Sequence, residues 1–297
     1  MPRFDEVLLT GTCNWISKSE YIVSAVLFGS TARRDRILGE VGSEFSDIDL
    51  HIIVNRGTKI DRVNWQCELP VGEYCMAAYR SASGGVRKVT VIFTSGQIDL
   101  VVVPIDMMRL ASLACFLGFH LKHGFVRAAL NEMATCLHGG YRFLKGERRW
   151  GSLYRNVSRL PGVRLNDAEV VSLANSAVCD VLWVRQKLRS GELVAAQHVL
   201  HTRVIDVNLR LWRELRFRRL RPPLAFGLGR KIEETLDKSD LERLRVSYLL
   251  RKEEIERATQ LALNGLLWLM QEIVPEWAIR PQMSKLLDQV RPIFPHS

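Results

Sequence analysis

The chain has no apolar run long enough to cross a bilayer, a span that takes about 20 consecutive apolar residues. Its longest candidate, residues 110–121, is too short for this and is typical of a buried element. The first residues, MPRFDEVLL, have neither the basic start nor the long apolar core of a secretory signal peptide. The sequence therefore predicts a cytoplasmic protein with no membrane partner.

Paired cysteines are also lacking. The chain has 6 cysteines, but none stands in a C-x-x-C pair, so neither structural zinc nor a disulfide framework is expected in a cytoplasmic chain. No repeat or low-complexity segment is present. The formal net charge of +10 fits a nucleic-acid partner, but it fits equally well the attraction of a nucleoside triphosphate.

The most informative stretch is residues 21–54, YIVSAVLFGSTARRDRILGEVGSEFSDIDLHIIV. It predicts an apolar strand that ends at Gly29-Ser30 and a second strand that opens with Asp47-Ile48-Asp49. Because side chains alternate along a strand, Asp47 and Asp49 should point the same way while Ile48 faces the core. Two adjacent carboxylates repel each other unless a cation lies between them, and oxygen ligands of this kind suit Mg²⁺.

A third acid is expected on a neighbouring strand. Residues 88–104, KVTVIFTSGQIDLVVVP, predict a β-hairpin with strands at 89–93 and 98–103 and a turn at 94–97. Asp99 lies early in the returning strand among apolar residues. A lone carboxylate in such a strand is costly unless it is paired or binds a metal.

Taken together, Gly29-Ser30, Asp47-Ile48-Asp49 and Asp99 resemble the DNA polymerase β-type nucleotidyltransferase superfamily, over about a third of the chain. The nearest likeness in size and layout is to the aminoglycoside and lincosamide nucleotidyltransferases. The charged connection RRDRILGEVGSEFS is longer than the spacer usual in that family. The resemblance implies an α/β (α+β) protein with an N-terminal polymerase β-like catalytic domain built on a mixed sheet.

The resemblance also implies the chemistry. Asp47, Asp49 and Asp99 would be the catalytic acids and the ligands of two Mg²⁺ ions, and ATP or another NTP would be the substrate. Asp99 would accept the proton of the attacking hydroxyl.

Four further residues are candidates for holding the nucleotide, namely Gly29, Ser30, Arg33 and Lys88. A Gly-Ser turn that enters a helix offers backbone N–H groups to a phosphate, although Ser30 would also suit a simple helix cap. Arg33 and Lys88 would offset charge on the triphosphate, or they are solvated surface charges. His51 lies on the acid face of its strand and either orients a ligand acid or is a core histidine with a hydrogen-bond partner.

The remainder of the chain predicts a helical bundle. We expect a catalytic domain at 1–150 and a helical domain at 151–297, with the linker within 148–166. Helices are expected at 107–121, at 125–137, from Asp167 with an Asn166/Glu169 capping box, at 193–220, and from a second capping box at 239–242 to about 273.

The acceptor is less constrained than the reaction. A small molecule with a hydroxyl group, such as an antibiotic, is the first expectation, and a neutral one suits the basic chain better than a cationic one. The stripe Arg203–Arg221 leaves RNA open as a partner. The alternative is that Leu209, Trp212 and Leu215 within it are core and its arginines form a solvated face. Transfer to RNA or protein, as in toxin–antitoxin systems, and a non-catalytic nucleotide-binding module are the alternatives.

Overall fold

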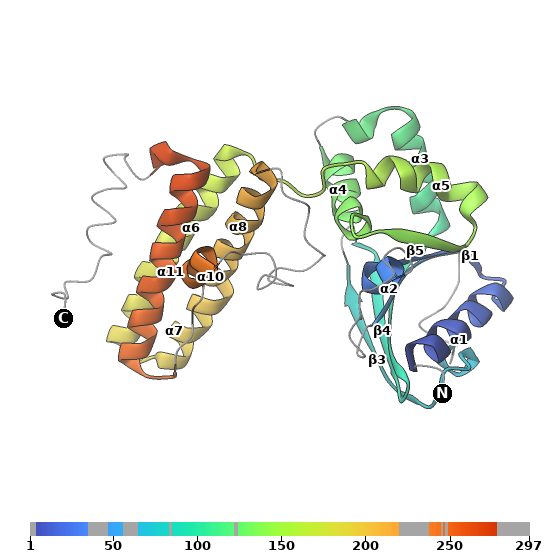
Figure 1. Ribbon diagram of the computed structural model, residues 1–297, viewed down its shortest axis with the longest axis horizontal. Helices are drawn as coiled ribbons and strands as arrows, with labels where there is room; N and C mark the ends of the chain where they lie inside the picture. The colour runs from blue at the N-terminus through green and yellow to red at the C-terminus, as the bar shows by residue number, and fades with distance from the viewer. Residues whose placement is uncertain are drawn as a thin grey trace. The chain divides into compact units, whose positions relative to one another are not determined.

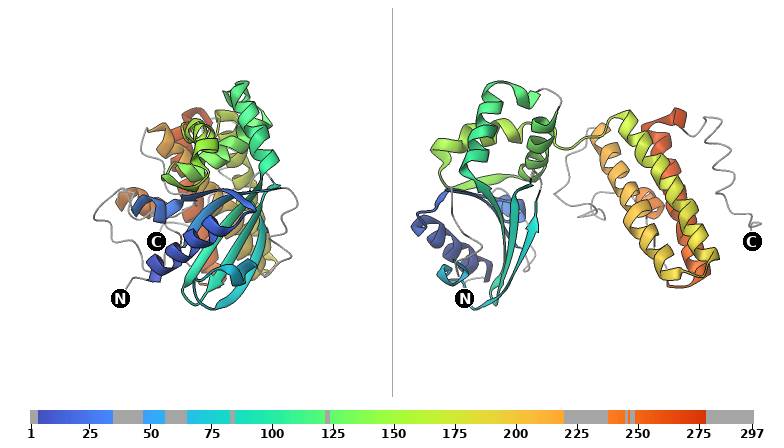
Figure 2. Two further views of the ribbon diagram at one scale, coloured as in Figure 1. Left: turned by 90° about the vertical axis from the view of Figure 1, so that its right-hand side faces the viewer. Right: turned by 180° about the vertical axis from the view of Figure 1, so that it is seen from behind.

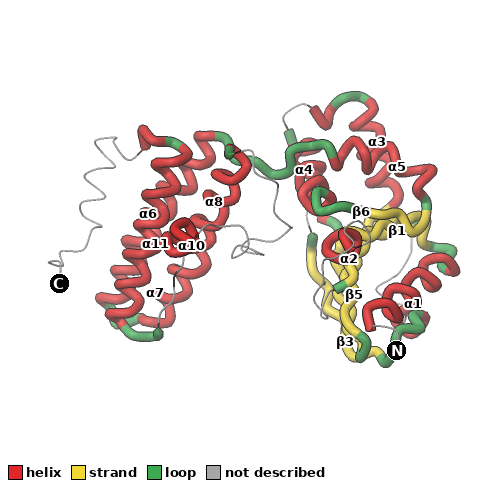
Figure 3. The backbone as a smooth tube through the Cα atoms, in the orientation of Figure 1, coloured by secondary structure: helices red, strands yellow, loops and turns green. Residues whose placement is uncertain are grey.

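The structure is a computed structural model, and it describes residues 4–34, 47–55, 65–82, 85–121, 124–219, 238–244, 246 and 249–277. The chain divides into two compact units, Met1–Val163 and Arg164–Ser297. Among the described residues all strands lie in the first unit, as the yellow segments of Figure 3 show. The predicted architecture, a mixed sheet followed by a helical domain, is confirmed.

The first unit is built on a sheet of six strands in the order β3-β4-β5-β2-β1-β6 (Figure 1). β2 and β5 run parallel, and the other neighbouring pairs are antiparallel. The strands are β1 Ile22–Phe28, β2 Ile48–Val54, β3 Tyr74–Ser81, β4 Arg87–Phe93, β5 Gly96–Pro104 and β6 Tyr141–Lys145.

Helices cover both faces of this sheet (Figure 2). On one face α1 (Phe4–Lys18) and the 3-10 turn η1 (Trp65–Glu68) bury Trp15 and Trp65 against alternate residues of the strands. On the other face lie α3 (Ile105–Phe116), α4 (Phe125–Leu137) and α5 (Glu147–Ser158). The short helix α2 (Gly29–Arg34) follows β1 directly, and the 3-10 turn η3 (Phe119–Leu121) follows α3.

The predicted strands and hairpin are present, with small shifts in their ends. β4 and β5 pair from Phe93 opposite Gly96, so the loop is the two residues Thr94 and Ser95 rather than four. The helix expected at 107–121 ends at Phe116. Two residues later Gly118 has a φ of +76°, which a helix does not continue through. The helix expected at 125–137 has these bounds.

The segment 148–166 differs from the linker that the sequence predicts. Its first part is the helix α5, which buries Trp150, Leu153, Tyr154 and Val157 at helical spacing, and the expected division at 150/151 falls within this helix. Two features gave the segment the composition of a linker: the arginines that alternate with these buried residues, and the Pro161-Gly162 pair.

The second unit is a bundle of helices. They are α6 Asp167–Arg189, α7 Leu193–Val199, the π-helical turn η4 Leu200–Ile205, α8 Asp206–Arg218, α10 Lys238–Leu244, α11 Lys252–Ile273 and the 3-10 turn η5 Pro275–Trp277. The capping box of Asn166 and Glu169 at the start of α6 is confirmed. The helix expected at 193–220 runs on through the π-helical turn and ends at Arg218.

The helix expected from 239 to 273 is instead two helices, α10 and α11. Arg251 has an extended backbone at the start of α11, and no glycine or proline marks this break in the sequence. The capping box expected at 239–242 lies inside α10, which begins at Lys238.

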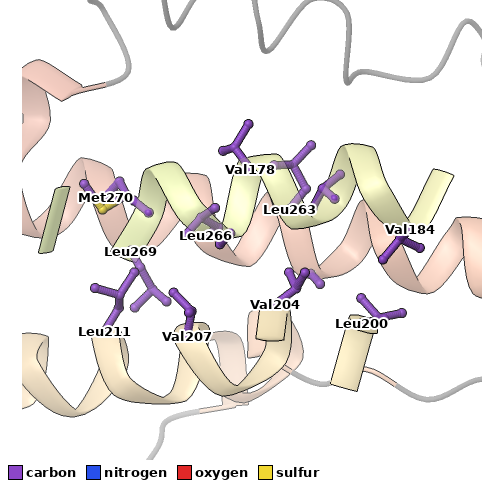
Figure 4. Close-up of a cluster of buried hydrophobic side chains, with 14 of the residues drawn as sticks. Val178, Val184, Leu200, Val204, Val207, Leu211, Leu263, Leu266, Leu269 and Met270 are labelled. Carbon is purple, nitrogen blue, oxygen red and sulfur yellow. The ribbon is translucent and has the colours of Figure 1, made fainter. Parts of the chain in front are cut away.

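The core of the second unit lies between α6, η4, α8 and α11 (Figure 4). Apolar side chains recur at three- and four-residue spacing along each helix and meet in one cluster. The cluster includes Val178 and Val184 of α6, Leu200, Val204, Val207 and Leu211 of η4 and α8, and Leu263, Leu266 and Leu269 of α11. None of the described helices is both long and apolar enough to span a membrane.

Candidate active site

Asp47, Asp49 and Asp99 meet at one end of the parallel pair β2–β5. Asp49 is the register partner of Asp99, and Asp47 directly precedes β2. One carboxylate oxygen from each of the three acids lies within 4.8 Å of the other two. Asp99 is 5% exposed, whereas Asp47 and Asp49 are partly exposed. The structure thus brings together the three acids that the sequence singled out.

Apolar alternation explains why the strands present these acids. Ile48, Leu50, Ile98 and Leu100 are buried in the core shared with α1, so the residues between them must point to the opposite face. That opposite face is covered farther along by α3, α4 and α5 but is open to solvent at Asp47 and Asp49.

The turn at Gly29 brings α2 against the acids. Gly29 has a φ of +78°, and a Cβ added there would lie 2.4 Å from Asp49 Oδ2. Both observations require glycine, because other residues rarely adopt this φ and a side chain would displace Asp49. Thr31 Oγ1 then donates a hydrogen bond to the carbonyl oxygen of Asp47 at 3.0 Å, which ties α2 to the start of β2.

Asp99 is held by two neighbours on its own face of the sheet. Lys88 Nζ lies 2.5 Å from Asp99 Oδ2, and Gln97 Nε2 donates to Asp99 Oδ1 at 3.2 Å. Lys88 reaches Asp99 from β4, where the two-residue loop sets Thr90 opposite Asp99 and Lys88 opposite Val101. Lys88, which the sequence offered as a phosphate contact, therefore pairs with a carboxylate in this structure.

Behind the acids lies a buried hydrogen bond between His51 and Tyr154. His51 follows Asp49 on the same face of β2, and its Nδ1 is hydrogen-bonded to the hydroxyl of Tyr154 of α5 at 2.5 Å. Burial lowers the pKa of His51 to about 4. Burial, with a smaller effect of Tyr141, raises the pKa of Tyr154. His51 is therefore a neutral core histidine with a partner, one of the two roles expected for it.

Three residues of this site were not singled out by the sequence. Gln97 was placed in the turn, although its spacing of two from Asp99 on one strand would have put both on the same face. Thr31 follows the Gly-Ser pair without any motif of its own, and Tyr154 comes from the segment that resembled a linker.

Two predicted nucleotide contacts are located only by their backbone. Ser30 and Arg33 belong to α2, immediately after the turn at Gly29. Their side chains, and residues 35–46 of the charged connection, lie outside the described residues.

The arginine stripe of the second unit is largely occupied by contacts within that unit. Trp212 is 4% exposed and Leu215 is buried with it, so both belong to the core. Phe217 lies under the guanidinium groups of Arg164 and Arg213. Further arginines form ion pairs: Arg203 with Asp180, Arg210 with Asp206, Arg218 with Asp167 and Glu214, and Arg219 with Asp240 and Glu272. Arg221 lies outside the described residues.

The donor set at the three acids fits a divalent cation. It consists of carboxylate oxygens from two adjacent strands, close enough to share one ion, and hard oxygen ligands are those that Mg²⁺ prefers. Without a cation, three carboxylates so close together repel one another, and the ion pair of Lys88 with Asp99 offsets part of that charge.

Comparison with known proteins gives few matches. No protein-family model matches the chain, and no curated protein matches it. Among solved structures the chain is similar to an aminoglycoside 6-adenyltransferase from Bacillus subtilis, at 12% identity and a TM-score of 0.34, over 95% of this chain and 97% of that one. It is also similar to a nucleotidyltransferase-like protein from Exiguobacterium sibiricum, at 14% identity and a TM-score of 0.30, over 96% of this chain and 79% of that one.

The names of both similar structures describe nucleotidyltransferases or nucleotidyltransferase-like proteins. Because both TM-scores lie below 0.5, these similarities carry no weight for the chemistry of the site. That chemistry is inferred from the residues of this chain.

Proposed function

We propose that the protein is a metal-dependent nucleotidyltransferase that moves a nucleoside monophosphate from an NTP, ATP being the first choice, to a hydroxyl group of a small molecule. The observation that carries this proposal is the meeting of Asp47, Asp49 and Asp99 beside the turn at Gly29. The carboxylates suit a metal ion, and the turn at Gly29, which admits no side chain, suits a phosphate. A nucleoside triphosphate with its metal brings both.

Asp47, Asp49 and Asp99 would hold Mg²⁺, up to two ions. When bound, Mg²⁺ would offset the charge of the phosphate oxygens and lower the pKa of the attacking hydroxyl. The turn of Gly29 and Ser30 would receive the phosphates that leave, and Arg33 would add positive charge from α2.

In the proposed step the acceptor hydroxyl oxygen forms a bond to the α-phosphorus. The bond between the α-phosphorus and the bridging oxygen of the β-phosphate breaks, and pyrophosphate leaves with that electron pair. The hydroxyl proton passes to the carboxylate of Asp99. Gln97 holds this carboxylate in place by donating a hydrogen bond to its Oδ1. The contribution of the protein is mainly positioning and charge stabilisation.

A small acceptor is favoured over RNA because arginines of the arginine stripe already make contacts within their own unit. RNA binding needs cationic groups that face phosphates. Arg210, Arg218 and Arg219 are instead paired with acids, and Arg213 lies over the ring of Phe217, all within their own unit. The net charge of +10 also disfavours a cationic acceptor and fits a neutral one.

The test is transfer of label from α-³²P-labelled ATP, GTP, CTP and UTP with Mg²⁺. The acceptors are a panel of lincosamides and aminoglycosides, total RNA, and proteins of a lysate. Label on a small molecule supports the proposal and names the acceptor class. Label on RNA or protein would move the activity to a macromolecular acceptor. Binding of an NTP with an affinity that Mg²⁺ does not change, and no transfer, would indicate a non-catalytic nucleotide-binding protein.

A further inference from the structure

Lys88 and Gln97 together occupy both oxygens of the Asp99 carboxylate. The ammonium group of Lys88 lies against Oδ2, and the Gln97 amide donates to Oδ1. The Asp99 side chain is 8% exposed, so its charge is stabilised by these two groups rather than by water. Lys88 therefore stands where a metal ion would act on Asp99.

The two partners differ in what they can do when a cation arrives. Gln97 is neutral, so it can remain hydrogen-bonded to a carboxylate that also binds a metal. Lys88 is positively charged, and its ammonium and a divalent cation would repel each other across the same oxygen. A metal ion that binds Oδ2 of Asp99 together with Asp47 and Asp49 would therefore displace the Lys88 ammonium from that oxygen.

Lys88 is built to make such a move. Its side chain is 31% exposed, so packing does not enclose it completely, and its stem of four carbons allows several rotamers. The backbone of β4 is held by pairing on both edges, with β3 and with β5. The movement therefore needs only rotation of the side chain.

We propose that Lys88 is a positioning residue that closes Asp99 to metal until a nucleotide is bound. The triphosphate would draw the ammonium from Asp99 to a phosphate oxygen, and the three acids would then bind the metal that the nucleotide carries. This inference rests on the proposed function, because it assumes that metal and nucleotide bind at the same acids. The inference predicts an order of binding: the nucleotide binds first and the metal then joins the three acids, whereas metal without nucleotide binds weakly.

The test measures Mn²⁺ affinity by electron paramagnetic resonance, with and without an ATP analogue that has a CH₂ group between its α- and β-phosphorus atoms. Lys88→Met removes the ammonium, and Lys88→Gln does so with a polar side chain in case the first variant folds poorly. Lys88→Arg keeps the charge. Arg87→Met is the matched control, since Arg87 is the neighbouring cation on β4 and belongs to the opposite face of the strand.

Without the analogue, Lys88→Met and Lys88→Gln should bind Mn²⁺ at least roughly tenfold more tightly than the wild type. Lys88→Arg and Arg87→Met should resemble the wild type. With the analogue, the gain from removing Lys88 should disappear, because the wild-type lysine has already left Asp99.

Two other results are distinguishable. In the first, the wild type binds Mn²⁺ in the presence of the analogue, but in its absence Lys88→Met and Lys88→Gln have the same Mn²⁺ affinity as the wild type. The role of Lys88 is then overturned and the proposed function stands. If the wild type binds no Mn²⁺ even with the analogue, the metal site itself fails, and both proposals fall with it.

Discussion

Asp49 and Asp99 are register partners across the parallel strands β2 and β5, although 49 residues separate them in the chain. Their strands are adjacent because the β3–β4–β5 run of antiparallel strands returns β5 to the edge of β2. This adjacency brings two carboxylates side by side, with Gly29 of the β1–α2 turn against the first and Lys88 of β4 against the second.

Gly29→Ala should reduce transfer activity far more than it reduces the free energy of unfolding. The backbone at φ +78° disfavours any side chain, and the new Cβ would lie 2.4 Å from Asp49 Oδ2. We expect a loss of about 1 kcal/mol in the free energy of unfolding and at least roughly a hundredfold loss of transfer activity, since the carboxylate must shift.

Gly118→Ala is the matched control for that variant. Gly118 has a φ of +76°, and an added Cβ would have no heavy atom within 4 Å. It should show the same backbone cost with unchanged transfer activity. Equal activity in the two variants would mean that the close approach to Asp49 has no part in the reaction.

Tyr154→Phe should destabilise the first unit by about 1–3 kcal/mol, because it leaves the buried Nδ1 of His51 without its hydrogen-bond partner. Urea unfolding followed by circular dichroism measures this loss. Tyr141→Phe removes a hydroxyl from the same aromatic cluster, in which the Tyr141 and Tyr154 rings lie 5.8 Å apart, and serves as the control. The interpretation is wrong if the two variants are equally stable.

Glu214 should make the stability of the second unit depend on pH. Burial acts to raise the pKa of Glu214, but hydrogen bonds from Arg164, the Leu165 amide and Arg218 outweigh it and lower that pKa below its ordinary 4.5. The stabilisation is therefore present above pH 4.5 and is lost as the pH falls through the lower pKa of the folded protein.

Glu214→Gln should accordingly lower the free energy of unfolding by about 2 kcal/mol at pH 7, with the difference from wild type shrinking below pH 4. Glu272→Gln is the control, because Glu272 pairs with Arg219 at a site that is 39% exposed. That variant should cost less than about 1 kcal/mol. A loss for Glu214→Gln that stays constant down to pH 3 would contradict the assignment.

The strands and the three acids could be predicted because their signals are local. Alternation of apolar residues fixes which side chains of 47–50 and 98–101 share a face, and Gly-Ser after a strand fixes where the chain turns. The pairing of Lys88 with Asp99 could not be predicted, since it depends on a hairpin loop of two residues rather than four.

Tertiary packing decided the other differences. Tyr154 reaches His51 from a helix whose arginines made its segment resemble a linker. The break between α10 and α11 has no glycine or proline to announce it. Some ion pairs of the arginine stripe, such as Arg218 with Asp167 and Arg219 with Glu272, join residues far apart in sequence, so the pattern could not show them.

The most direct test of the account compares ATP labelled at the α-phosphorus with ATP labelled at the γ-phosphorus, in the presence of Mg²⁺ and an acceptor taken from the panel above. Nucleotidyl transfer predicts that the α-label appears on the acceptor and the γ-label in pyrophosphate, and that Asp49→Asn abolishes both. The γ-label on the acceptor would show phosphoryl transfer instead. Undiminished transfer by Asp49→Asn would contradict the assignment of the reaction to these acids.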